Sequence, residues 1–133
     1  MVIDAEKNPQ GWKSPKPLYA ARLFVGFSVG QKPTWDIDDL ISIVARTRKK
    51  QKRALDASFL VQKGIYTSKI SGETVTEDGA QVLILNLDDL KLADFEADMT
   101  ALAEAIARKM KQEEVIVEIQ KGGITKMTFG VVP

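Results

Sequence analysis

Alternating hydrophobic and polar residues mark the first strand of this chain. The segment 22–29 carries an apolar residue at every second position, namely Leu23, Val25, Phe27 and Val29. Side chains two residues apart share one face of a strand, so the pattern predicts a strand with one buried face. Gly30 and Pro33 follow and are expected to end it.

Two segments show the period of an amphipathic helix. The first carries the apolar stripe Ile37, Leu40, Ile41 and Val44. Asp36 suits its N-cap, and Trp35 before it can pack on Leu40 as a hydrophobic staple. The second helix is expected over 94–111, with Asp94 as its cap and basic residues at its C-terminal end.

The remaining hydrophobic runs are short and bounded by turn residues, which is typical of strands. Strands are expected over 58–67, 73–76, 80–87, 115–120 and 124–131. Ser71-Gly72, Asp78-Gly79 and Gly122-Gly123 predict tight turns between them. Gly26 and Gly64 fall inside strands, where a bulge or the close approach of another group is expected.

The order of these elements predicts the fold class. With additions left aside the order is β-α-β-β-α-β, which indicates an α+β, ferredoxin-like two-layer sandwich with an added C-terminal hairpin strand. Both helices should cover one face of an antiparallel sheet. We expect a single domain over 20–133 and an extended or disordered N-terminal arm over 1–19, whose large apolar residues are Trp12 and Tyr19.

Composition narrows the chemistry that this domain can perform. The 133 residues include no cysteine and no histidine, which excludes thiol nucleophiles, the usual zinc sites and any imidazole base. The net charge of +1 creates no global attraction to nucleic acid or membrane. No glycine-rich phosphate-binding motif and no calcium-loop pattern occurs, so we expect no cofactor and no metal. The absence of a signal sequence favours the cytoplasm.

One strand is apolar on both of its faces. Val82 and Ile84 lie on one side of the expected strand 80–87, and Leu83, Leu85 and Leu87 on the other. Such a strand is normally covered on both faces, and the helices cover only one. A second copy of the same sheet is the simplest cover, so we expect a homo-oligomer, most simply a homodimer.

The uncovered sheet face also holds the candidate ligand-binding residues. These are Arg22, Phe24, Gln62, Tyr66 and Glu118. The surface is apolar with a few polar groups, as dimer interfaces and small-ligand pockets both are. The polar residues therefore form either the rim of an interface or the working groups of a pocket.

A basic stretch follows the first helix and is the second candidate site. It contains Arg46, Arg48, Lys49, Lys50, Lys52 and Arg53. Such a cluster can contact phosphates of a nucleic acid, but cations are also favoured at a helix C-terminus by the helix dipole. No aromatic residues are interleaved with it, and strand 80–86 lacks the aromatic residues with which RNA-recognition modules stack bases. Nucleic-acid binding is therefore not the favoured reading.

Three short runs carry a resemblance to a known group. They are Arg22-Leu23-Phe24-Val25-Gly26, the segment 78–82, and Gln112-Glu113-Glu114-Val115. Together they resemble small uncharacterised bacterial proteins of ferredoxin-like topology, a domain of unknown function. The resemblance covers about residues 20–120 and implies the topology. It implies no activity and transfers no site residue.

Three functions are open on these observations. The favoured one is a non-enzymatic homo-oligomeric module that packs sheet to sheet and encloses a small apolar ligand. The first alternative is an enzyme of the dimeric α+β-barrel kind that uses Tyr66 and Glu118. The second is nucleic-acid binding through residues 46–53.

Overall fold

The computed structural model describes residues 18–53 and 58–133. Within them the chain forms two helices, α1 (Ile37–Lys50) and α2 (Leu92–Lys109). The strands are β1 (Tyr19–Gly26), β2 (Ser28–Val29), β3 (Lys32–Pro33), β4 (Phe59–Ile70), β5 (Glu73–Leu85), β6 (Val115–Lys121) and β7 (Ile124–Val131). Trp12, an expected anchor of the arm, lies outside the described residues.

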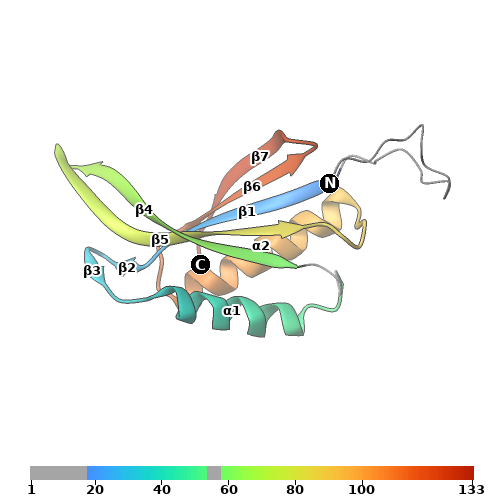
Figure 1. Cartoon of the computed structure of the whole chain (residues 1–133), viewed down its shortest axis with the longest axis horizontal. Helices are drawn as coiled ribbons and strands as arrows, with labels where there is room; N and C mark the ends of the chain where they lie inside the picture. The colour runs from blue at the N-terminus through green and yellow to red at the C-terminus, as the bar shows by residue number, and fades with distance from the viewer. Residues whose placement is uncertain (1–17, 54–57) are drawn as a thin grey trace, which may run out of the picture.

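Five of these strands form one antiparallel sheet in the order β4-β5-β1-β6-β7. β1 lies at the centre, between β5 and β6, and β7 extends the sheet through a hairpin with β6. Strands β2 and β3 form a separate small hairpin beyond the end of β1. Both helices lie on the same side of the sheet (Figure 1). The predicted α+β class, the order of its elements along the chain and the added C-terminal strand are confirmed.

The core lies between the helices and one face of the sheet. β1 contributes Leu23 and Val25, α1 contributes Leu40 and Val44, and all four side chains are fully buried. The largest buried side chain of α2 is Phe95. Alternate residues of β1 are buried and half-buried, as its sequence predicts. Within residues 18–53 and 58–133, no helix lies over the other face of the sheet (Figure 1).

α1 begins at a complete capping box. The backbone N–H of Asp39 donates to the Asp36 carboxylate at 3.0 Å, and the N–H of Asp36 donates to the Asp39 carboxylate at 3.0 Å. These two bonds satisfy backbone donors that have no partner inside the helix. Trp35, the residue before the cap, donates from its ring nitrogen to the carbonyl of Met110 at 2.8 Å. The start of α1 is thereby tied to the end of α2.

The other end of α1 is held by charged groups. Arg53 forms ion pairs with Asp94 and Asp98 of α2, each at 2.7 Å. Gln51, the C-cap of α1, donates to the carbonyl of Asp98 at 2.8 Å. The two helices are therefore connected to each other at both ends.

The main difference from the sequence prediction is in the second hairpin. The turn at Ser71-Gly72 forms as expected, with positive φ angles of 53° and 83°. The second turn predicted at Asp78-Gly79 does not exist, because β5 runs unbroken from Glu73 to Leu85 and pairs with β4 along its length. The part of the hairpin near its turn extends beyond the helices (Figure 1).

Other element boundaries also differ from the prediction. Tyr19, assigned to the N-terminal arm, is the first residue of β1 and pairs with Lys121. α2 begins at Leu92 after Lys91, one turn earlier than expected, so Asp94 lies in the first turn instead of at the cap. There its carboxylate still faces the positive end of the helix dipole. None of the described helices is long and apolar enough to cross a membrane.

The capping box provides the first test of the structure. We expect Asp36→Ala to lower the free energy of unfolding by about 1 kcal/mol, because one backbone donor of α1 loses its partner. Asp38→Ala is the matched control: Asp38 lies in the same turn, is exposed, and makes no capping bond. Urea unfolding of both variants measures the difference, and an equal loss in both would contradict the capping role.

Candidate functional site

Tyr66 of β4 and Glu77 of β5 are direct cross-strand partners. By strand alternation they share the uncovered face of the sheet with Gln62 of β4 and Phe24 of β1. Directly opposed residues in an antiparallel pair have their side chains close together. The register of the hairpin between β4 and β5, called the long hairpin below, therefore places the phenol of Tyr66 beside the carboxylate of Glu77. Both lie near the end of β1.

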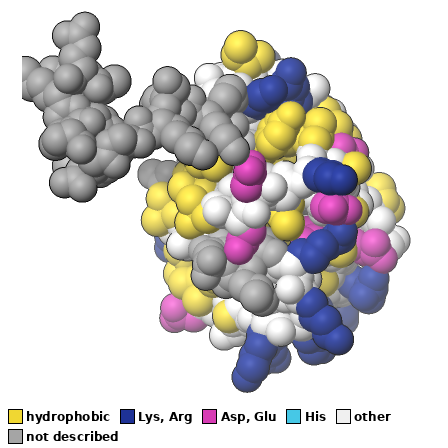
Figure 2. All heavy atoms as spheres, turned by 90° about the vertical axis from the view of Figure 1, so that its right-hand side faces the viewer, with side chains coloured by type: hydrophobic (Ala, Val, Ile, Leu, Met, Phe, Trp, Pro, Cys, Tyr) yellow, Lys and Arg dark blue, Asp and Glu magenta, His cyan; other side chains and the backbone are white. Residues whose placement is uncertain are grey.

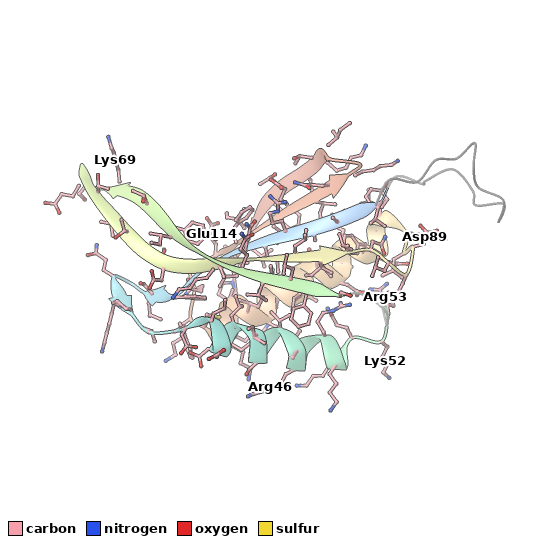
Figure 3. The ribbon with its side chains drawn as sticks, in the orientation of Figure 1. Arg46, Lys52, Arg53, Lys69, Asp89 and Glu114 are labelled. Carbon is pink, nitrogen blue, oxygen red and sulfur yellow. The ribbon has the colours of Figure 1, made fainter. Side chains whose placement is uncertain are left out.

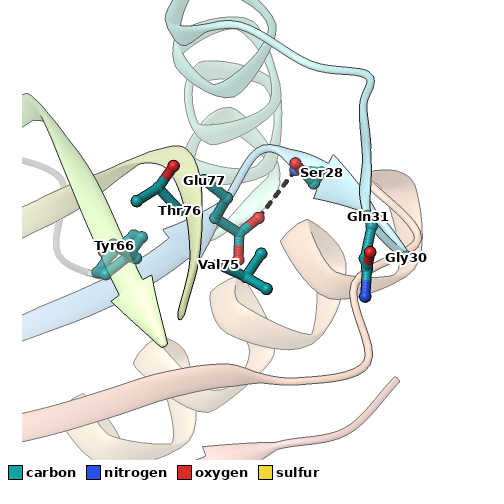
Figure 4. A pocket seen from close by; sticks show the side chains of 7 residues that line it. All are labelled: Ser28, Gly30, Gln31, Tyr66, Val75, Thr76 and Glu77. Atoms are coloured by element: carbon teal, nitrogen blue, oxygen red, sulfur yellow. Dashed lines mark hydrogen bonds between the residues drawn. The ribbon is translucent and has the colours of Figure 1, made fainter. Parts of the chain in front are cut away.

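The Glu77 carboxylate is held in place by the backbone. Its Oε2 accepts a hydrogen bond from the N–H of Ser28 at 3.0 Å, drawn as the dashed line in Figure 4. The carbonyl of Ser28 in turn accepts from the side-chain amide of Gln112 at 3.0 Å. Gln112 is buried and also donates to the carbonyl of Met110 at 3.1 Å. The end of α2, the β2–β3 hairpin and β5 therefore form one connected unit.

These groups line a hollow at this end of the molecule. Its lining residues are Ser28, Gly30, Gln31, Tyr66, Val75, Thr76 and Glu77 (Figure 4). A second hollow adjoins it, shares Ser28, Gly30, Gln31 and Glu77, and adds Lys111, Gln112, Glu113 and Glu114. Three carboxylates and one ammonium therefore surround the joined hollows, and the surplus of negative charge favours a cationic ligand.

Tyr66 keeps its proton at neutral pH. Burial raises the pKa of its hydroxyl, and the charge of Glu77 raises it further, while a backbone hydrogen bond with Val25 partly opposes this. The hydroxyl donates to the carbonyl of Ala80 at 2.9 Å. A neutral phenol beside a carboxylate can orient a ligand by hydrogen bonding, but it is a poor base.

The five predicted ligand-binding residues all lie on the uncovered face, but the structure does not bring them together. Arg22 pairs with Leu83 on one side and with Glu118 on the other, and Leu83 pairs with Leu60. Tyr66 lies six residues beyond Leu60 along β4, which is roughly 20 Å. The proposed joint use of Tyr66 and Glu118 is therefore not supported within one chain. Glu118 instead accepts a hydrogen bond from Gln120.

The remaining two of the five lie between these positions. Phe24 and Gln62 line a shallow hollow on the far side of Tyr66. Gln62 accepts a hydrogen bond from its cross-strand partner Gln81 at 3.0 Å. Whether these residues bind a ligand stays a prediction.

The basic stretch lies on the helix side of the molecule, away from the hollow beside Tyr66 and Glu77. Figure 2 shows lysines and arginines gathered at its lower edge, where α1 lies in Figure 1. Arg46 and Lys52 lie along this side in Figure 3, far from Lys69 near the tip of the long hairpin. Arg53 is engaged in ion pairs with α2, and burial lowers the pKa of the half-buried Arg48. Lys49, Lys50, Lys52 and Arg46 are exposed. Phosphate binding there stays a prediction.

Glu77, Ser28 and Gln112 were missed by the sequence analysis. Glu77 precedes Asp78-Gly79, and the false turn placed it in a loop instead of in a strand opposite Tyr66. The alternation of side chains along β5 was the signal that could have identified Glu77. In an unbroken strand, residues 77, 79 and 81 share one face. Among the described residues, no cluster of carboxylates could hold a metal ion.

Comparison with known proteins identifies similar solved structures. A phage SAM lyase in complex with S-methyl-5'-thioadenosine is 38% identical over 92% of this chain and 95% of that chain, with a TM-score of 0.76. A phage SAM lyase in the apo state is 37% identical over 92% of this chain and 94% of that chain, with a TM-score of 0.77. No family model and no curated protein matches the chain.

These matches overturn the expectation of a non-enzymatic module. Both similar structures are enzymes, and the alignments cover nearly the whole of both chains. The designation of unknown function is corrected by the same finding, because both similar structures have a stated activity. The prediction failed because the lack of cysteine and histidine was weighed against catalysis of every kind.

The raised pKa of Tyr66 predicts a change of stability at alkaline pH. The unfolded tyrosine titrates near pH 10, so folding favours the protonated form. The contribution of Tyr66 to stability is therefore complete below about pH 10 and is lost as the pH rises through the folded-state pKa. Urea unfolding from pH 8 to 11 should show a steeper alkaline decline in the wild type than in Tyr66→Phe. Parallel curves would contradict the shift.

Proposed function

This chain belongs to the phage SAM lyase family, and we propose that it cleaves S-adenosylmethionine to release S-methyl-5'-thioadenosine. One observation about the chain itself supports this proposal. The carboxylate of Glu77, fixed by the Ser28 amide, lies opposite a neutral Tyr66 in a hollow with surplus negative charge. A sulfonium substrate that also carries an ammonium group is a cation of the kind that such a hollow favours.

The reaction breaks one carbon–sulfur bond. S-methyl-5'-thioadenosine is S-adenosylmethionine without its aminocarboxypropyl chain, so the bond between sulfur and the γ-carbon of that chain must break. The bonding electron pair goes to sulfur, and the sulfonium becomes a neutral thioether. The γ-carbon then needs a new electron pair, either from the substrate's own carboxylate, which closes a lactone, or from the adjacent C–H bond, which leaves an alkene.

The residues of the hollow favour the lactone route. The alkene route requires a base for a weakly acidic C–H bond, and a carboxylate has an ordinary pKa of about 4. Tyr66 is protonated. The lactone route needs no proton transfer, because the substrate's carboxylate oxygen forms the new bond as the sulfur leaves.

The two side chains then act by position and charge. Glu77 attracts the positive end of the substrate and fixes it in the hollow, and the Tyr66 hydroxyl orients the substrate by hydrogen bonding. The rate gain would come from holding the flexible chain folded, with its carboxylate oxygen in line with the carbon–sulfur bond. No external nucleophile, acid or base is required.

Loss of the Glu77 charge is the direct test. We expect Glu77→Gln to reduce kcat/KM for S-adenosylmethionine by roughly 100-fold, a typical cost for removing one electrostatic partner of the reacting group. Glu73→Gln is the matched control, since Glu73 lies exposed on the same strand near the hairpin turn. Chromatography measures S-methyl-5'-thioadenosine, and proton NMR distinguishes the lactone from the alkene, which have the same mass. A wild-type protein that forms no S-methyl-5'-thioadenosine would sink the proposal.

We also propose that another copy of the chain covers the open sheet face. Leu60 is 60% exposed there, and Leu83, Phe24 and Ile116 on the same face are only half-buried. A soluble protein rarely leaves an apolar sheet face of this extent uncovered. Such an assembly would also close the hollow against water.

Phosphate binding by the basic stretch and a cytoplasmic location stay predictions.

Assembly is tested by mass in solution. We expect light scattering to give a particle mass of at least twice the chain mass of 14.7 kDa. Leu60→Lys should lower that mass, because it places a charge in the apolar contact, whereas Lys52→Gln on the helix side should not. A monodisperse wild-type monomer would contradict the proposed cover.

A further inference from the structure

Three glycines form a row across the sheet beside the proposed site. Gly64 of β4 pairs with Gly79 of β5, and Gly79 pairs with Gly26 of β1. The row lies next to the Tyr66–Glu77 pair on the same face. Glycine weakens a strand, so its recurrence in three adjacent strands calls for a physical reason. None of the three has a positive φ, so backbone conformation is not that reason.

At Gly79 the space of a missing side chain is filled by the Tyr66 ring and by the backbone of β1. A Cβ built on Gly79 would lie 2.2 Å from Cε2 of the Tyr66 ring and 2.5 Å from the carbonyl oxygen of Val25. The ring therefore leans from its own position back over the backbone of Gly79. From there its hydroxyl reaches the carbonyl of Ala80.

At Gly26 the corresponding space is filled by Glu77. A Cβ built there would lie 2.7 Å from Oε2 and 2.8 Å from Oε1 of the carboxylate. The side chain of Glu77 leans over β1 in the same way as Tyr66 leans over β5. In that position its Oε2 meets the N–H of Ser28.

The two occupied spaces are neighbours, because Gly79 and Gly26 are direct partners with Cα atoms roughly 5 Å apart. We infer that Gly26 and Gly79 are positioning residues, whose missing side chains bring the Glu77 carboxylate and the Tyr66 ring together. This inference rests on the proposed function, since it assigns both glycines to the same site. Gly64 differs from both, because a Cβ there would meet nothing within 4 Å.

Gly26→Ala tests the inference most cleanly. The atoms in its way belong to the end of a flexible side chain, so the protein should fold with the carboxylate displaced. We expect kcat/KM to fall roughly 10- to 100-fold, as a displacement of about 1 Å can cost. Gly64→Ala is the matched control and should keep the wild-type value. In a Glu77→Gln background Gly26→Ala should cause little further loss, because the residue acts through Glu77.

A merely structural role predicts a different result. Gly26→Ala would then lower activity by the same factor with Glu77 or Gln at position 77, and that outcome overturns the inference. Unchanged kcat/KM in Gly26→Ala overturns it as well. Should Gly26→Ala fail to fold, Gly26→Ala/Glu77→Ala removes the conflicting carboxylate and should fold. If that double variant also fails, the glycine serves the strand alone and the inference is wrong.

Amide hydrogen exchange separates this inference from the proposed function. The N–H of Ser28 is protected by the Glu77 carboxylate. It should exchange faster in Gly26→Ala than in the wild type, and at the wild-type rate in Gly64→Ala. A wild type without lyase activity refutes the proposed function, while the exchange rate still reports whether Gly26 seats Glu77. An unchanged exchange rate in Gly26→Ala refutes the seating even where the wild type is active.

Discussion

The pairing of β5 with β4 on one side and β1 on the other is the constraint on which the site depends. This single register places Glu77 opposite Tyr66 and Gly79 opposite both Gly64 and Gly26. A slip of one residue would send every side chain of β5 to the other face of the sheet. Val82 and Ile84 would then leave the core, so the packing that stabilises the fold also fixes the site. Stability and function share one strand register.

Most of the fold could be predicted because its signals are local. The Asp36 cap, the Ser71-Gly72 turn and the Gly122-Gly123 hairpin each depend on residues within a few positions. Asp78-Gly79 carries the same local signal as a turn, yet pairing with two neighbouring strands keeps β5 extended there. Gly79 instead leaves room for the ring of Tyr66, which is thirteen residues away in the chain. A local pattern does not distinguish a glycine required by a turn from one required by a distant side chain.

The site could be predicted only in part for the same reason. Tyr66 was placed correctly on the uncovered face, but its partner was taken to be Glu118, which lies three strands away in the sheet. The hydrogen bonds that define the site, from Ser28 to Glu77 and from Gln112 to Ser28, join segments far apart in sequence. The hydrophobic pattern predicts which face of the sheet a residue lies on and the order of the elements. It does not predict which carboxylate lies beside Tyr66, because that depends on the register of the strands.

The proposed chemistry explains how an enzyme can do without histidine and cysteine. In that proposal the sulfonium sulfur is already activated as a leaving group, and the substrate supplies its own nucleophilic carboxylate. The protein then has no need to generate a strong base, and a raised pKa that keeps Tyr66 protonated is no disadvantage. What remains is to hold a flexible cation in one conformation, which is a task for rigid geometry and fixed charge. A carboxylate held by a backbone amide and a ring seated over a glycine are suited to that task, because the backbone of the sheet fixes where each of them lies.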